Sequence, residues 1–366
     1  MGNMKADEIL IVYGDDPAGM ARRIAEEAGL AELIGDRGKR IGLKPNLVVS
    51  RPAGEGATTH PEIAGGLIGY LKNAGFTNIV ILEGSWVGDN TRDAFRVCGY
   101  RDLAGETGVE LIDTQLDSAR PRDCKGMKIE ICNSALDVDF MINMPVMKGH
   151  CQTLLTCALK NSKGLIPDRE KRRFHSLGLH KPIAHLNTAV RSDFIVVDGI
   201  CGDLDFEEGG NPVPAGRIFA ARDPVLCDAW AAEQMGYRVE EIPYILLAEK
   251  LGAGRSGPAR TRELNRPAFP PGGSSGPRPG AKVRQLALHI EESDACSACY
   301  AALVFALSRM DRGEPARLGA KVAVGQGFRG KPGALGSGNC CSGFSRFCPG
   351  CPPSGADVLA FLRGPG

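Results

Sequence analysis

Cysteine is the residue type whose spacing in this sequence points most directly to chemistry. Six of the thirteen cysteines lie beyond residue 295, and four of them form the pairs C-S-A-C (296–299) and C-P-G-C (348–351). The first pair opens a run with helical character, where an i, i+3 spacing places both sulfurs on one face. Two such pairs in a short segment predict a metal site. The alternative is that these thiols are buried side chains that bind nothing.

The spacing alone leaves the kind of metal open. A zinc site would use the two pairs, but their separation greatly exceeds the roughly 15–20 residues typical of a zinc ribbon. A [4Fe–4S] cluster also takes four thiolates and tolerates irregular spacing. Pro352 follows Cys351, and glycines surround Cys340, as expected for backbone that approaches a cluster closely.

The first 250 residues alternate short β-branched runs with helical patterns, which predicts an α/β domain with a mostly parallel sheet flanked by helices. Ligands bind beyond the carboxyl ends of the strands in such sheets. Lysine, histidine and asparagine at predicted strand ends favour a small anionic substrate, such as a carboxylate or a phosphate. The predicted substrate-binding residues are Lys44, Asn46, Lys160, Asn161 and Lys163. The predicted catalytic residues are His60, His150, His175 and Lys148.

The same residues also have structural interpretations. The sequences K-P-N (44–46) and T-H-P (59–61) can be loops in which proline fixes a turn and asparagine or threonine caps a helix. Lys160 and Lys163 fall at the end of a helix predicted to begin near Cys151, where cations complement the helix dipole. These lysines therefore either complete a helix or face a cleft.

Three histidines recur every five residues, at His175, His180 and His185. On a helix this spacing turns successive rings about 140° apart, so they would not share a metal ion unless a turn intervenes. Gly178 could supply that turn between the first two. His175 or His180 is the better candidate for a general acid or base.

The chain is long enough for more than one compact unit. We predict an α/β domain over residues 1–251, a linker rich in Gly, Pro and Arg over 252–282, and a small α/β, cysteine-rich domain over 283–366. The small domain is expected to open with a strand at 284–290 and a helix at 295–310. It has few large apolar side chains, and a metal site would compensate for its limited core.

The composition excludes several functional classes. Lys plus Arg number 44 against 43 Asp plus Glu, so the net charge of +1 provides no basic field for nucleic acid binding. The sequence has no apolar run long enough for a membrane span and no export signal, so we expect a cytoplasmic protein. The G-Q-G-F-R-G sequence (325–330) is not followed by a helix pattern, which argues against a nucleotide site.

An ordered set of motifs resembles the family with domain of unknown function (DUF) 362. It includes K-P-N-L-V (44–48), N-M-P-V-M-K-G-H (143–150), L-K-N-S-K-G-L-I-P (159–167) and I-V-V-D-G (195–199). The C-terminal G-N-C and P-G-C-P-P sequences resemble a cysteine-rich segment found in some members. The P-G-C-P-P element is also similar to one that supplies a [4Fe–4S] ligand in small subunits of hydrogenases and respiratory complex I.

This resemblance implies a [4Fe–4S] cluster held by Cys296, Cys299, Cys340 and Cys351, with Cys341 and Cys348 as alternates. It implies no reaction, because the family is named for its lack of one. From the residues we expect an iron–sulfur oxidoreductase in which the cluster relays electrons to a small anionic substrate. The alternatives are a non-enzymatic electron carrier or assembly factor for a larger redox partner, and a structural zinc or cluster site on a non-redox enzyme.

Overall fold

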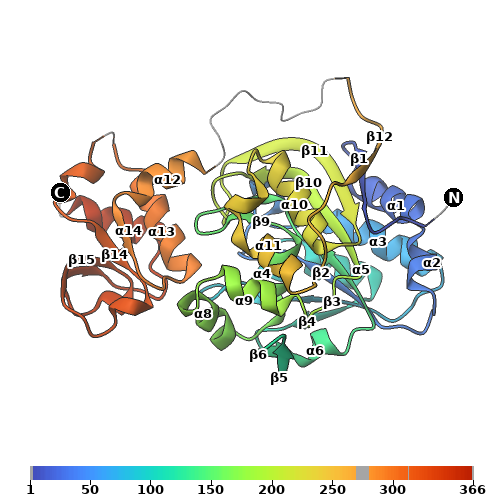
Figure 1. Ribbon diagram of the computed structural model, residues 1–366, viewed down its shortest axis with the longest axis horizontal. Helices are drawn as coiled ribbons and strands as arrows, with labels where there is room; N and C mark the ends of the chain where they lie inside the picture. The colour runs from blue at the N-terminus through green and yellow to red at the C-terminus, as the bar shows by residue number, and fades with distance from the viewer. Residues whose placement is uncertain (1–2, 269–279, 312, 365–366) are drawn as a thin grey trace.

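The computed structural model describes residues 3–268, 280–311 and 313–364. Within these residues the chain forms a large α/β unit and a small C-terminal unit (Figure 1). The N-terminal end of the chain lies on the side of the large unit that faces away from the small one (Figure 1). Of the predicted linker, residues 269–279 lie outside the described residues.

The large unit is built on an eight-stranded sheet. In spatial order its strands are β12 (Arg260–Leu264), β1 (Glu8–Tyr13), β11 (Pro212–Ala221), β10 (Phe194–Asp203), β7 (Phe140–Met144), β2 (Ile41–Pro45), β3 (Ile79–Glu83) and β4 (Glu110–Asp113). Only β11 runs antiparallel to its neighbours, and every other neighbouring pair is parallel. The predicted mostly parallel sheet is confirmed, and β12 adds an edge strand from within the predicted linker.

Helices cover both faces of this sheet because its strands are apolar on both sides. In β1, Ile9 and Ile11 enter one core, whereas Leu10 and Val12 enter the other. One face is covered by α1 (Pro17–Ala28), α2 (Leu30–Ile34), α3 (Pro61–Asn73), α4 (Thr91–Val97) and α5 (Tyr100–Thr107). The other is covered by α7 (Ala158–Asn161), α8 (Asp168–Ser176), α9 (His180–Leu186), α10 (Pro224–Gln234) and α11 (Pro243–Lys250).

The order of the strands reverses between β2 and β7. From β2 the chain moves through β3 to β4 at one edge, and from β7 it moves through β10 and β11 in the opposite direction. Such a reversal leaves a crevice at the carboxyl ends of the two strands, where α/β proteins bind ligands. Two hairpins accompany the sheet, and α6 (Asn133–Leu136) follows the first of them. They are β5 (Ala119–Cys124) with β6 (Met127–Cys132), and β8 (Lys148–His150) with β9 (Leu154–Thr156).

The helix predicted to begin near Cys151 is wrong. That segment forms the β8–β9 hairpin, and α7 begins only at Ala158. The Asp228 carboxylate of α10 accepts hydrogen bonds from the backbone N–H groups of Ala158 (2.7 Å) and Leu159 (3.3 Å). The start of α7 is thus fixed by a residue distant in sequence, which no local pattern reveals.

The small unit has a four-stranded parallel sheet with helices. Its elements are α12 (Ala281–Ala287), β13 (Ile290–Glu292), α13 (Ser297–Ser308), β14 (Val322–Val324), β15 (Gly333–Ser337), β16 (Phe344–Cys348) and α14 (Gly355–Arg363). The strand predicted at 284–290 is wrong, because most of that segment is α12. Its run of Arg, Gln, Leu and Ala favours a helix, and local propensity outweighs the short apolar alternation here.

The first turn of α13 docks against the large unit. Gln152, in the β8–β9 turn, donates from Nε2 to the carbonyl of Ala295 at 3.1 Å and accepts from Ser297 Oγ at 2.9 Å. Cys151 and Phe206 of the large unit belong to the core of the small one. These contacts fix the residues around Cys296 relative to the carboxyl end of the large sheet.

Two glycines of α3 provide a matched test of helix packing. A Cβ atom on Gly66 would come within 2.3 Å of the Ala18 carbonyl oxygen in α1, whereas one on Gly69 meets nothing within 4 Å. Gly66→Ala should lower the free energy of unfolding by about 1–3 kcal/mol through overpacking. Gly69→Ala should raise it by up to about 1 kcal/mol through helix propensity. Urea unfolding measures both, and equal effects would contradict this packing.

Candidate functional site

A cavity opens at the carboxyl ends of β2 and β3, beside the β8–β9 hairpin. It encloses about 660 Å³ of empty space, including the part open to solvent, and the first turn of α13 contributes to its wall. Four lysines line it, and we call it the lysine cavity; they are Lys148, Lys160, Lys163 and Lys171. Two histidines, His150 and His175, and two carboxylates, Glu83 and Glu207, complete its charged or titratable lining from the large unit. Four amines against two carboxylates suit an anionic ligand.

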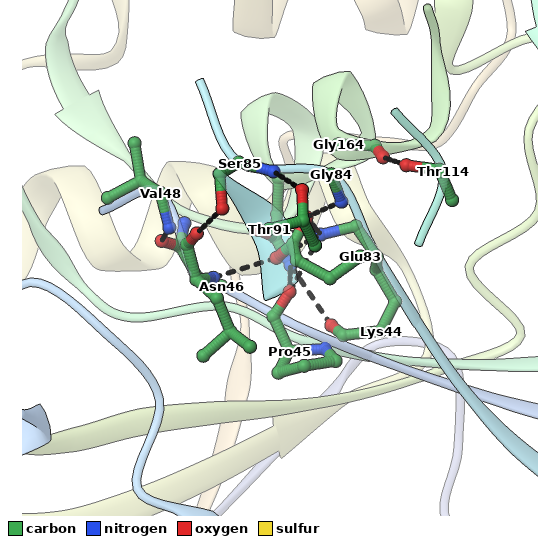
Figure 2. A network of polar contacts seen from close by, with 12 residues as sticks. Lys44, Pro45, Asn46, Val48, Glu83, Gly84, Ser85, Thr91, Thr114 and Gly164 are labelled. Atoms are coloured by element: carbon green, nitrogen blue, oxygen red, sulfur yellow. Dashed lines mark hydrogen bonds and ion pairs between the residues drawn. The ribbon is translucent and has the colours of Figure 1, made fainter. Parts of the chain in front are cut away.

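The floor of this cavity is a buried ion pair between adjacent parallel strands (Figure 2). Lys44 at the end of β2 is 1% exposed, and its Nζ lies 2.9 Å from Glu83 at the end of β3. Glu83 also accepts the backbone N–H groups of Leu47 and Gly84, both at 2.7 Å. Burial lowers the pKa of Lys44, and attraction to Glu83 opposes this shift. Lys44, predicted to bind substrate, lies behind the cavity lining and supports Glu83.

The two predicted asparagines line the cavity, but their amide groups form hydrogen bonds within the protein. Asn161 donates from Nδ2 to the carbonyl of Lys44 at 3.1 Å and to Asn143 Oδ1 at 2.8 Å. Asn46 accepts from Lys148 Nζ at 3.3 Å. Their amides therefore position the strand ends and the lysines.

The lysines differ in how far the protein satisfies their amines. Lys148 Nζ donates to the Glu207 carbonyl at 2.8 Å and to the Ala57 carbonyl, and burial lowers its pKa to about 7. Lys171 Nζ donates to the Ser85 carbonyl at 2.7 Å. Lys163 Nζ lies 3.5 Å from His175 Nε2. These amines are held at three points around the cavity.

His150 presents a proton donor toward the cavity. Its Nδ1 accepts the backbone N–H groups of Gln152 (3.0 Å) and Thr153 (3.2 Å), so the neutral ring carries its proton on Nε2. Nε2 lies 3.4 Å from Glu207 Oε1 and 3.5 Å from Ser297 Oγ. Burial, followed by the charges of nearby lysines, lowers the pKa of His150 well below its usual value, so the ring is neutral at pH 7.

His60 lies elsewhere, contrary to the expectation that it faces the cleft. It is not part of the lysine cavity's lining. Its Nδ1 lies 2.7 Å from Asp198 Oδ2, and its backbone N–H donates to the same oxygen at 2.9 Å. Burial alone would lower the pKa of His60, but the hydrogen bond and charge of Asp198 outweigh it and raise the pKa. The pair joins the start of α3 to β10 and suits a structural role.

The other histidines do not gather around one point. His175 lines the lysine cavity, where burial and the charges of Lys163 and Lys160 lower its pKa well below the usual value. His180 stacks on Tyr244 with ring centroids 5.8 Å apart. His185 hydrogen-bonds through Nδ1 to the Cys124 carbonyl at 2.7 Å. Only His175 of the three is thus available to a cavity ligand among the described residues.

A second cavity brings together four cysteines from separate parts of the small unit. Its lining includes Cys296, which precedes α13, Cys299 in the first turn of α13, Cys340 after β15, and Cys351 after β16. We call it the cysteine cavity. All four are free thiols. This is the set that the sequence resemblance implied as ligands.

The two alternate cysteines face other surroundings. Cys341 is buried and donates from Sγ to the Ala323 carbonyl at 3.4 Å. Cys348 is buried in the apolar core of the small unit with residues such as Leu335 and Val358. Neither lines the cysteine cavity.

The four thiols of the cysteine cavity are a set of groups that can ligate metal. Tetrahedral Zn–S bonds of about 2.3 Å would bring four sulfurs to about 3.8 Å from one another. Among the described residues, no three of these four sulfurs lie within 4.8 Å of one another. Burial and the nearby thiols of Cys296, Cys351 and Cys340 raise the pKa of Cys299. A cationic centre between the sulfurs would relieve that repulsion.

Polar groups also line the cysteine cavity. Ser337 Oγ is buried and, within the described residues, has no hydrogen-bond partner. Arg329 Nε donates to Cys340 Sγ at 3.4 Å. Gly338, at φ +88°, would carry its Cβ 3.6 Å from Cys299 Sγ, so a side chain there would intrude on the cavity. An unpaired hydroxyl, a guanidinium and a bare backbone all suit a sulfur-rich anionic group.

The two cavities share part of their walls. Val87, Cys296 and Ala298 line both of them. Lys163 of the lysine cavity lowers the pKa of Cys296 by its charge, although burial and neighbouring thiols raise it overall. A group bound at the four cysteines would therefore lie next to a ligand in the lysine cavity.

Sequence reasoning missed several cavity residues. Lys171 stands in E-K-R-R-F-H, where basic residues are frequent and none is singled out. Glu207 and Thr156 are brought to the cavity by a loop and a hairpin with no chemical motif. Ser297 lies between Cys296 and Cys299, and only these cysteines marked its segment as a site.

The family with domain of unknown function (DUF362) matches residues 41–233, and the chain belongs to this family. The matched region holds the lysine cavity's residues from the large unit and ends before the six C-terminal cysteines. A related protein is the "Thylakoid-associated protein sll1697" of Synechocystis sp., which is 23% identical over 241 residues, or 63% of this chain and 73% of that protein. None of the described helices is long and apolar enough to cross a membrane.

Two solved structures share a distant likeness. The lactate racemase apoprotein from Thermoanaerobacterium thermosaccharolyticum is 14% identical, with a TM-score of 0.42 over 66% of this chain. A protein from Thermotoga maritima is 15% identical, with a TM-score of 0.37 over 65% of this chain. The match spans 60% of the length of each of these proteins.

The buried ion pair in the cavity floor generates a stability test. Glu83→Gln leaves the Lys44 ammonium buried without a carboxylate, so the free energy of unfolding should fall by about 3–5 kcal/mol. The control, Glu110→Gln, breaks an ion pair with Arg40 in which Glu110 is 64% exposed, and should cost less than about 1 kcal/mol. Denaturant unfolding at pH 7 measures both. Equal losses would show that Lys44 does not depend on Glu83.

Proposed function

We propose that this protein is an iron–sulfur oxidoreductase. In this proposal Cys296, Cys299, Cys340 and Cys351 hold a [4Fe–4S] cluster, and the lysine cavity binds a small anionic substrate. The observation that carries the proposal is the shared wall, because Cys296 lines both cavities. When bound, a [4Fe–4S] cluster supplies one-electron transfer. The substrate would then lie within a short distance of the redox centre.

The surroundings of the four cysteines favour a cluster over zinc. No three of these sulfurs lie within 4.8 Å of one another among the described residues, whereas a single tetrahedral zinc ion would bring all four to about 3.8 Å from one another. Ser337 Oγ and the Arg329 guanidinium can donate hydrogen bonds to sulfur, and such bonds tune the potential of clusters.

Residues of the lysine cavity would bind and protonate the substrate. The ammonium groups of Lys148 and Lys163 would hold its anionic group, because an anion bound there restores the protonated form that burial disfavours. His150 would deliver the proton on Nε2, while Gln152 and Thr153 hold Nδ1. His175, next to Lys163, is a second candidate for proton transfer.

An electron carrier without catalysis is the less favoured function. A carrier has no need of a cavity lined by four lysines and two neutral histidines next to its redox centre. An enzyme of this kind needs an external electron-transfer protein. Cys351 is exposed, so such a protein could approach the cluster there. Arg172 and Arg329 are exposed at the same cavity and would favour an acidic partner.

The test is the iron and sulfide content of protein purified without oxygen. We expect a brown protein with about four iron and four acid-labile sulfide per chain, as one [4Fe–4S] cluster requires. Cys340→Ser should lower the iron content sharply, because it removes a ligand. The adjacent Cys341→Ala is the matched control and should retain iron, because Cys341 faces the Ala323 carbonyl. Colourless protein with one zinc per chain would reject the proposal, as would iron loss only in Cys341→Ala.

A further inference from the structure

Lys160 is chemically distinct from the other lysines in and behind the lysine cavity. Lys44, Lys148 and Lys171 donate to protein oxygen atoms, and Lys163 lies beside His175. Within the described residues, the Lys160 amine makes no hydrogen bond and no ion pair, although it lines the same cavity. Its amine is therefore available to a ligand without the loss of any protein contact.

The surroundings of Lys160 make a neutral, nucleophilic amine accessible at neutral pH. Burial lowers the pKa of Lys160 to about 7, the nearby charge of Lys148 contributes in the same direction, and Glu207 opposes the shift. An ordinary lysine has a pKa near 10.4 and is almost wholly protonated at neutral pH. A lysine desolvated beside another cation is the arrangement that activates amines toward carbonyl carbon.

Other cavity groups fit a ligand with both a carbonyl and an acid group. Thr156 Oγ1 and Glu207 Oε1 are buried and line the cavity, and neither forms a hydrogen bond within the described residues, although Glu207 Oε1 lies 3.4 Å from His150 Nε2. Buried polar atoms left unpaired indicate a site built for a polar ligand. The amines of Lys148 and Lys163 can pair with a carboxylate. These groups line the same cavity as Lys160.

We propose that the lysine cavity takes a small 2-oxo carboxylic acid and that Lys160 forms a Schiff base with its carbonyl carbon. The Nζ lone pair attacks that carbon, and the carbonyl oxygen takes a proton as the C–N bond forms. The C–O bond then breaks, the oxygen leaves as water, and the nitrogen, having lost both of its protons, is doubly bonded to carbon. No electrons are gained or lost. This inference rests on one part of the proposed function, that the lysine cavity binds the substrate. It does not require the cluster.

Reductive trapping tests this assignment. The full-length protein is incubated with pyruvate or 2-oxoglutarate and sodium cyanoborohydride, which converts an imine to a stable secondary amine. Intact-protein mass spectrometry and peptide mapping then locate the adduct. We expect a single saturable adduct on Lys160 with at least one of these acids. Lys160→Arg keeps a long basic side chain but cannot form an imine, so it should lose the adduct, whereas Lys181→Arg, at an exposed lysine outside the cavity lining, should retain it.

Three outcomes would overturn the assignment. They are no adduct with either acid, an adduct of equal yield in Lys160→Arg, and an adduct spread over exposed lysines without saturation. The thermal unfolding midpoint of each variant, measured alongside, shows whether it is folded. Iron and sulfide are measured on the same samples. If no adduct forms but four iron are present per chain, this inference fails and the cluster proposal stands. If an adduct forms in protein that binds no iron, the cluster proposal fails and this inference stands.

Discussion

Cys296 and Lys163 act on each other electrostatically across the wall between the two cavities. Burial raises the pKa of Cys296 and lowers that of Lys163; against this, the charge of Lys163 lowers the pKa of Cys296, and a Cys296 thiolate raises that of Lys163. Both groups are otherwise disfavoured in their charged forms by burial. Negative charge at the cysteines therefore promotes positive charge on the lysine, and the protonated lysine attracts an anion. This pair couples the two cavities electrostatically.

The lysine cavity lies where backbone groups beyond the strand ends have no partners within the sheet. The strand order reverses between β2 and β7, and the backbone beyond their carboxyl ends must find other partners. Glu83 accepts two backbone N–H groups there and holds the Lys44 ammonium between the strands. The β8–β9 hairpin extends from this region and reaches Ala295 and Ser297 of the small unit. The Lys44–Glu83 pair and the β8–β9 hairpin thereby position two sides of the lysine cavity.

Much of the fold could be predicted, because it follows from local patterns. Continuous apolar strands such as β7 and β10 indicated a parallel sheet with both faces covered, and the family was evident from ordered motifs. The two wrong elements had different causes. The late start of α7 at Ala158 depends on Asp228 of α10, which accepts its first backbone N–H groups, whereas the segment of α12 has both helix and strand tendencies.

The site could be predicted only in part. Lys148, His150, Lys160 and Lys163 follow strand ends or their nearby loops, and the structure brings them to one cavity. Lys44 and His60 also follow that rule, but their carboxylate partners hold them outside the cavity lining, and such pairing is a property of tertiary structure. Glu207 and Lys171 carried no motif. The use of these residues in binding and catalysis remains a prediction.

The most direct measurement is an anaerobic crystal structure with anomalous diffraction recorded at the iron absorption edge. The proposal predicts iron density between Cys296, Cys299, Cys340 and Cys351, resolved into four sites, with the iron bound by Cys296 nearest the lysine cavity. A single zinc peak among these sulfurs, disulfide bonds between them, or iron bound by Cys341 and Cys348 instead would contradict it.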